Sequence, residues 1–253
     1  FNMRNPIFAD KRVRQALCYA FPKEQFMETV LDGVGSWADT SIAPSSWAHK
    51  PDLKRYDYDV EKAKQLLDEA GWKSGPDGVR VKDGKKLAFS ISTNSGNKIR
   101  EKFNEICKQE WDSIGCQVTI QNYEAASLFG DILDNVKFDI IVFGWISGFD
   151  PDCKTLFHSG QIVDPATGAT GQNYVAYNNP RMDELLDAGL KEPDLEKRKE
   201  IYYEIQDILA EDVPYLFVYF YNEIAAVPAN LGNFKPNPTQ ATNSWNMFEW
   251  EWK

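Results

Sequence analysis

Residues 87–92 read LAFSIS, residues 116–121 read CQVTIQ and residues 138–143 read FDIIVF, and these three runs decide the fold. Each run is short and carries β-branched or aromatic residues, which predicts a strand. Apolar residues recur at helical spacing over about 97–114, and a second helix is predicted over about 124–134. The order β-α-β-α-β predicts an α/β fold whose sheet has parallel neighbours and crossover helices.

The third predicted strand opens directly into GWISGFDPD, residues 144–152. Ligands in open α/β sheets bind beyond the carboxyl ends of strands, so Trp145 is well placed to form a binding wall, which Phe149 extends. The small residues Ser147 and Gly148 would let a ligand backbone approach closely, and Tyr174 is expected to form a second wall. The alternative is that these aromatic residues only pack their own loops.

Asp150 has two possible roles in this stretch. Pro151 has a fixed φ and no N–H, so it suits the first position of a helix, with Asp150 as the N-cap and Asp152 in the first turn. In the functional reading, Asp150 faces the ligand beside Trp145 and accepts an ammonium group through a charge-assisted hydrogen bond. The sequence leaves both readings open.

Away from this centre, the sequence predicts further helices and two further strand regions. N-cap residues, apolar spacing and helix-ending glycines predict helices that begin at Asp10, Pro22, Asp59, Asn179 and about Asp194. Asp83-Gly84 predicts a type I′ turn that joins a strand at 79–82 to the strand at 87–92. Residues 214–219 are predicted to form a strand, residues 34–58 a long aromatic-rich loop, and the tail from 228 an irregular segment.

Composition excludes several classes of protein. The formal net charge of −10, from 38 acids against 28 bases with no basic block, argues against a nucleic-acid partner and favours a cationic or zwitterionic ligand. No run of about 18 apolar residues could cross a membrane. The 2 histidines are far apart and the 4 cysteines are unclustered, so we expect neither a tightly bound metal nor a cofactor.

The motifs of common catalytic sites are missing from the sequence, including G-x-S-x-G, H-E-x-x-H and the phosphate-binding glycine loops. His158 and Ser159 are neighbours in sequence, but a catalytic pair is defined by side-chain geometry. Asp57-x-Asp59-x-Glu61 lacks the glycine and the terminal glutamate of a calcium loop, and helix capping accounts for Asp59. We therefore expect a protein that is not an enzyme.

Several segments, in order and with similar spacing, resemble family 5 extracytoplasmic solute-binding proteins, the oligopeptide, dipeptide and nickel receptors of ABC importers. The likeness covers nearly the whole chain. Its segments are FADKRVRQAL (8–17), YDVEKAKQLLDEAGW (58–72), DGKKL (83–87), IGCQV (114–118), GW…DPD (144–152), FHS (157–159), NY…YNNP (173–180) and EDVP (211–214).

The resemblance implies a lobe of the type II periplasmic-binding-protein fold, with a mixed sheet, taken from a larger two-lobed protein. Residues 1–227 would be the C-terminal ligand-binding lobe, including the loop at 34–58, and residues 228–253 a tail that crosses back toward an N-terminal lobe. The implied partners are a peptide or peptide-like solute, ABC permease subunits and that N-terminal lobe. The implied location is extracytoplasmic, as a periplasmic protein or as a cell-surface lipoprotein whose membrane anchor lies outside this chain.

One departure from the family bears on the ligand. Peptide-binding members often carry an Asp after the loop Trp to hold the ligand's α-ammonium, and here Ser147-Gly148 takes that place. The resemblance therefore predicts a substrate-capture component for oligopeptides or peptide-like solutes, with a receptor for a sugar, an opine or a metal chelate as the alternative. A hydrolase that uses the His158 region is the contrasting class, and a purely structural or sensory domain is the third.

Overall fold

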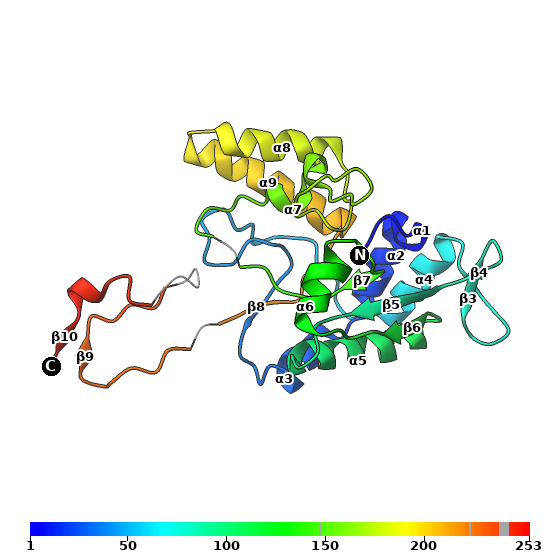
Figure 1. Cartoon of the computed structure of the whole chain (residues 1–253), viewed down its shortest axis with the longest axis horizontal. Helices are drawn as coiled ribbons and strands as arrows, with labels where there is room; N and C mark the ends of the chain where they lie inside the picture. Colours follow the sequence, from blue (N-terminus) through cyan, green and yellow to red (C-terminus); the bar gives the residue numbers. More distant parts are fainter. Residues whose placement is uncertain (147, 223, 238–242) are drawn as a thin grey trace.

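The computed structural model describes residues 1–146, 148–222, 224–237 and 243–253. Its central layer is a three-stranded parallel sheet in the order β6-β5-β7 (Figure 1). Phe89 pairs with Val118 and Ile91 with Ile140, so the buried strand β5 lies between its two partners. The bounds are β5 Ala88–Ser92, β6 Gln117–Ile120 and β7 Ile140–Ile141.

The connections confirm the predicted β-α-β-α-β unit. Helix α5 (Lys98–Ser113) joins β5 to β6, and Asn97 caps it by accepting a hydrogen bond from the Arg100 N–H. Helix α6 (Ala125–Ser127) and the π-helix η1 (Leu128–Leu133) join β6 to β7. The third strand is shorter than predicted, because only two residues of 138–143 pair with β5.

Antiparallel pairs lie in separate small sheets. The predicted turn is confirmed, because Asp83 and Gly84 both have positive φ, at 50° and 75°, as a type I′ turn requires. The predicted partner strand is wrong, because β3 pairs with β4 and not with residues 88–92. The chain leaves the hairpin at the buried Leu87 and enters the parallel sheet beside it. The bounds are β2 Lys73–Ser74, β3 Arg80–Lys82 and β4 Lys85–Lys86.

The N-terminal helices pack on this sheet and form one apolar core with it, in which α2 packs against α4. Asp10 and Asp59 cap α2 and α4 as predicted, since their carboxylates accept hydrogen bonds from Arg12 and Lys62 backbone N–H groups. Pro22 stands at the N-cap of α3, one position before the predicted place. The bounds are α1 Pro6–Ala9, α2 Lys11–Tyr19, α3 Lys23–Thr29 and α4 Val60–Glu69.

A second core lies under a helical layer, drawn in green to orange above the sheet in Figure 1. The predicted helices at Asn179 and Asp194 are confirmed. The side-chain oxygen of each of these two residues accepts hydrogen bonds from backbone N–H groups in the first turn. The loop at 34–58 contributes Ile42 and Ala48 to this core and Tyr56 to the first one. The bounds are α7 Lys154–Phe157, η2 Ser159–Gln161, α8 Pro180–Lys191 and α9 Leu195–Asp212.

The predicted strand at 214–219 is wrong, because only Tyr219–Phe220 (β8) pairs, antiparallel to Ser36–Trp37 (β1). The residues before β8 pack by their rings instead, with the Tyr215 ring centroid 5.0 Å from that of Phe157. Figure 1 shows the tail running away from the body and ending in a short β9–β10 pair. The division at 227/228 stays a prediction. The tail bounds are β9 Leu231–Gly232, η3 Met247–Glu249 and β10 Glu251–Trp252.

One buried cation joins the two cores. Arg14 of α2 is 4% exposed, and its Nε donates to the carbonyl oxygens of Asp212 and Val213 at 3.0 Å. Its Nη1 donates to the carbonyl oxygens of Phe8 and Ala9. The positive guanidinium therefore lies at the carboxyl end of α9, where the helix dipole favours a cation.

Replacement of Arg14 by Met should lower the free energy of unfolding by about 3 kcal/mol, because the buried carbonyl oxygens of Phe8 and Val213 and the partly buried ones of Ala9 and Asp212 lose their donor. Urea unfolding of the purified chain measures this change. Arg181→Met is the control, because the Arg181 side chain is 53% exposed and bonds only surface carboxylates among the described residues. Equal losses for the two variants would contradict the role assigned to Arg14.

Candidate functional site

The carboxyl ends of β5, β6 and β7 meet at one edge of the sheet, and the loop after β7 rises from that edge. Aromatic rings form a continuous wall there. The ring centroids of Phe129 and Phe143 lie 5.9 Å apart, and those of Phe143 and Trp145 lie 5.1 Å apart. The Trp145 indole then stacks on Tyr174, with centroids 6.3 Å apart and planes 15° from parallel. We call these four residues the aromatic wall.

The aromatic wall brings together the two most important residues of the predicted site. Trp145 is 37% exposed and Tyr174 is half-buried, so each keeps ring surface for contact while the other supports it. Burial, together with the negative charge of Asp134, raises the pKa of Tyr174. Tyr174 therefore keeps a neutral hydroxyl at physiological pH and presents both an apolar face and a polar tip.

Two other predicted site residues, Gly148 and Phe149, lie apart from the aromatic wall. Phe149 is 79% exposed and Gly148 is exposed, so both are available for contact but neither is packed into the wall. Ser147 lies outside the described residues. Their contact with a ligand stays a prediction.

Asp150 is held by the protein itself. Its Oδ2 accepts a hydrogen bond from Nη1 of Arg198 at 2.8 Å, and its Oδ1 accepts one from Nη2, also at 2.8 Å. This side-chain bond to Arg198 lowers the pKa of Asp150, so its carboxylate is charged across the physiological range. A contact between Asp150 and a ligand ammonium would have to share these oxygens with a guanidinium.

The predicted helix beginning at Pro151 is wrong, because α7 begins at Lys154 with Cys153 as its N-cap residue. Asp150 Oδ1 accepts from the Asp152 N–H at 3.0 Å, and Asp152 Oδ1 accepts from the Lys154 N–H at 2.9 Å. Each carboxylate thus bonds the amide two residues along, which gives the backbone an alternative to helical hydrogen bonds.

Arg100 is a candidate site residue that the sequence analysis missed. Its Nη1 donates to Asn94 Oδ1 at 2.6 Å, and its Nη2 lies 3.4 Å from the position that a Cβ on Gly144 would occupy. The guanidinium thus lies beside the residue that precedes Trp145. It forms no salt bridge with any of the residues that the structure describes, so it keeps donors for an anionic group.

A sequence signal for Arg100 did exist. Arg100 stands in the first turn of α5, three residues after the N-cap Asn97. The positive end of the helix dipole disfavours a cation there, and acidic residues are the usual choice. A cation at an unfavourable position in the first turn of the helix that follows a predicted strand is a reason to suspect a ligand contact.

The region around His158 does not form a catalytic pair in this structure. Ser159 Oγ donates to Asp183, and His158 Nδ1 accepts a hydrogen bond from the Gly160 N–H at 2.9 Å. The hydroxyl and the imidazole are therefore bonded to other groups and not to each other. Within the described ranges, no group of three or more His, Cys, Asp or Glu side chains could hold a metal ion.

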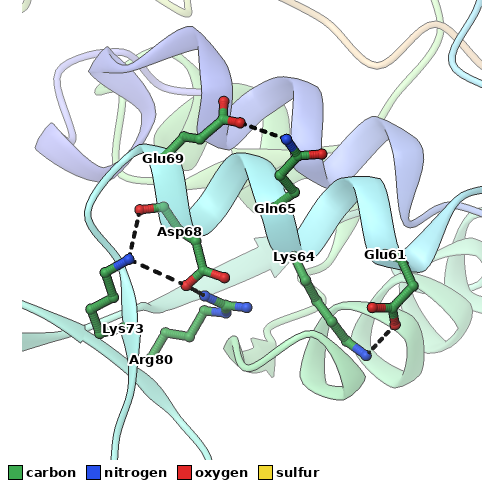
Figure 2. A pocket seen from close by; sticks show the side chains of 7 residues that line it. All are labelled: Glu61, Lys64, Gln65, Asp68, Glu69, Lys73 and Arg80. Atoms are coloured by element: carbon green, nitrogen blue, oxygen red, sulfur yellow. Dashed lines mark hydrogen bonds and ion pairs between the residues drawn. The ribbon is translucent and has the colours of Figure 1, made fainter.

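A second feature is a hollow of about 480 Å³, which is lined by side chains of α4 together with Lys73 of β2 and Arg80 of β3. Figure 2 shows that its charged side chains bond one another or, in the case of Glu69, the amide of Gln65. Lys64 pairs with Glu61 at 2.9 Å, and Arg80 pairs with Asp68 at 2.9 Å. Because these charges are already paired, we assign no binding role to this hollow.

Comparison with known proteins defines the class. Residues 1–161 match the family described as bacterial extracellular solute-binding proteins, family 5 middle region. The chain is 37% identical to the oligopeptide-binding protein AppA of Bacillus subtilis (strain 168), over 99% of the chain and 45% of that protein. This chain therefore belongs to the family 5 bacterial extracellular solute-binding proteins.

Two solved structures place the chain within that family. AppA from Bacillus subtilis in complex with a nonapeptide superposes with a TM-score of 0.86 at 36% identity, over 100% of this chain and 49% of that one. NikZ from Campylobacter jejuni in complex with Ni(L-His) gives 0.84 at 32% identity, over 99% and 50%. The chain spans about half the length of these relatives, and none of its described helices is long and apolar enough to cross a bilayer.

The stacked pair should contribute a measurable coupling energy. A double-mutant cycle with Trp145→Ala and Tyr174→Ala should give about 0.5–1.5 kcal/mol of interaction in the free energy of unfolding, as aromatic pairs do. The same cycle with Tyr58→Ala in place of Tyr174→Ala is the control, because Tyr58 bonds Glu110 on a different element. A coupling near zero in the first cycle would mean that the rings do not support each other.

Proposed function

We propose that this chain is a ligand-binding lobe of the solute-capture component of an ABC importer, and that its solute is an oligopeptide or a peptide-like molecule. The observation that carries the proposal is the aromatic wall with Arg100 beside it, at the carboxyl end of the parallel strands. The 37% identity to an oligopeptide-binding protein supports the same conclusion. No chemical step is part of this function.

The wall suits a ligand of variable sequence. The flat faces of the stacked Trp145–Tyr174 pair gain contact area with any side chain or peptide plane, and they demand little directional hydrogen bonding. Arg100 adds one fixed charge, whose planar fork of donors matches a carboxylate. A peptide would therefore place a carboxylate near Arg100 and its chain along Trp145 and Tyr174.

A metal chelate is the second candidate. The NikZ structure with Ni(L-His) is 32% identical and superposes over 99% of this chain. A histidine chelate carries a carboxylate, so Arg100 could serve it as well. The metal would then be part of the solute, held by the solute's own ligands, which agrees with the missing ligand cluster among the described residues.

The function implies a location and partners. Capture for an importer takes place outside the cytoplasmic membrane, in the periplasm or at the cell surface. The partners are the permease subunits that accept the solute and a second lobe that covers the aromatic wall from the other side. Phe149 and Ile146, at 79% and 76% exposure, are the side chains of this loop that a second lobe or a ligand would cover.

The complete gene product should bind peptides through their carboxylate. Arg100→Gln should weaken binding of a free-acid peptide by about tenfold or more, and should change binding of the same peptide as a C-terminal amide by much less. The peptide is chosen from a synthetic random pool by native mass spectrometry, and affinities are measured by calorimetry.

Lys102→Gln is the matched control, because Lys102 lies on the same helix and pairs with Glu105 on the surface at 2.9 Å. Its affinity for both peptides should equal that of the wild type. Retention of nickel-histidine chelate in place of any peptide would favour the second candidate. Retention of neither would contradict the proposed function.

A further inference from the structure

Arg198 of α9 makes a forked ion pair with Asp150 in the loop after β7. Two parallel N–H···O bonds of 2.8 Å fix the carboxylate in both position and orientation, which a single bond does not do. Asp150 is five residues beyond Trp145 in sequence. The pair therefore ties the far end of this loop to the helical layer.

Arg198 is itself restrained from three directions. Its Nε donates to the Gly189 carbonyl oxygen at 2.7 Å, at the end of α8. Its guanidinium carbon lies 5.5 Å from the ring centroid of Trp47 and 5.4 Å from that of Tyr202. The side chain is only 19% exposed. A cation held by a carbonyl group and two rings has few alternative rotamers, so it acts as a rigid support.

The loop needs such a support. Ile146 and Phe149 are largely exposed, so apolar packing does little to fix their backbone. The Asp150 carboxylate accepts hydrogen bonds from Arg198 of α9, and it also accepts one from the Asp152 N–H. If the pair with Arg198 is lost, the described residues between Trp145 and Asp150 lose this direct bond to α9, and the next anchor in the second core is the buried Cys153.

We propose that Arg198 is a positioning residue for solute binding: through Asp150 it holds the loop that carries Trp145 in the conformation that meets the solute. The inference rests on the proposed function for its effect on affinity, but the effect on the loop is independent of it. Asp150 then serves the loop and does not bind a ligand ammonium, because an ammonium would approach a carboxylate whose two oxygens already face a guanidinium.

The test uses Arg198→Lys and Asp150→Asn in the complete gene product. Lysine keeps the charge and the packing stem but cannot form the fork, and asparagine can still accept the Asp152 N–H. Arg181→Lys is the matched control, since Arg181 makes a similar fork to Glu204 (2.7 and 2.9 Å) between α8 and α9, away from the loop.

The first readout is backbone order without any ligand, measured by ¹⁵N relaxation. The order parameters of Trp145 and Phe149 should fall toward about 0.6 in Arg198→Lys and in Asp150→Asn, and should stay higher in the wild type and in Arg181→Lys. Unchanged order parameters in both variants would overturn the proposal. This readout tests the positioning role of Arg198 even if the wild type retains no peptide. That outcome would refute the proposed function but not the positioning role.

The second readout is affinity for one pool-selected peptide with a free amino terminus and for its N-acetylated form. Arg198→Lys, Asp150→Asn and the double variant should each weaken both forms by about the same factor, roughly tenfold, because both residues act through one pair. A loss in Asp150→Asn that is confined to the free-amino form would show a direct ammonium contact and overturn the positioning role. Arg181→Lys should bind both forms as the wild type does.

Discussion

The position of α9 depends on one buried cation. Arg14 lies under the carboxyl end of this helix and donates to carbonyl groups of α1 and of the α9 terminus. Burial lowers the pKa of Arg14, but an arginine remains protonated, so the charge is stabilised by these carbonyl dipoles. Val213 caps the helix with φ of 49°, an unfavourable conformation for a β-branched residue, and its carbonyl oxygen is one of the Arg14 acceptors.

The same helix connects this constraint to the loop after β7. Its carboxyl end is fixed to the first core through Arg14, and Arg198, one turn from its amino end, holds Asp150. Burial alone would raise the pKa of Glu211 near the carboxyl end, but hydrogen bonds from Lys11 and Lys54 lower it to about 2. Charged side chains at both ends of α9 therefore link the loop after β7 to the first core through one helix.

Under the proposed function, the choice of solute depends on which charges near the aromatic wall stay unpaired. The aromatic wall is largely indifferent to ligand sequence, so discrimination falls to the few charges that remain unpaired. In this chain the loop carboxylate is paired inside the protein, and the guanidinium of Arg100 keeps its donors. A small change in which charge is paired would change the preferred ligand without changing the fold.

Local sequence was enough to predict the parallel βαβαβ unit, the capped helices at Asp10, Asp59, Asn179 and Asp194, and the family. It also singled out Trp145 and Tyr174 as candidate site residues; the structure places them side by side, and their contact with a ligand stays a prediction. These features rest on local spacing and on the rule that ligands bind at strand carboxyl ends. Three features depend on tertiary contacts. The ring of Tyr215, in the segment 214–219, packs against Phe157, and β4 is the strand that pairs with β3 in the hairpin. Asp150 pairs with Arg198, 48 positions away in the sequence. The partner of a carboxylate depends on which distant helix lies beside it. The residues around Asp150 in the sequence carry no pattern that identifies Arg198 as its partner.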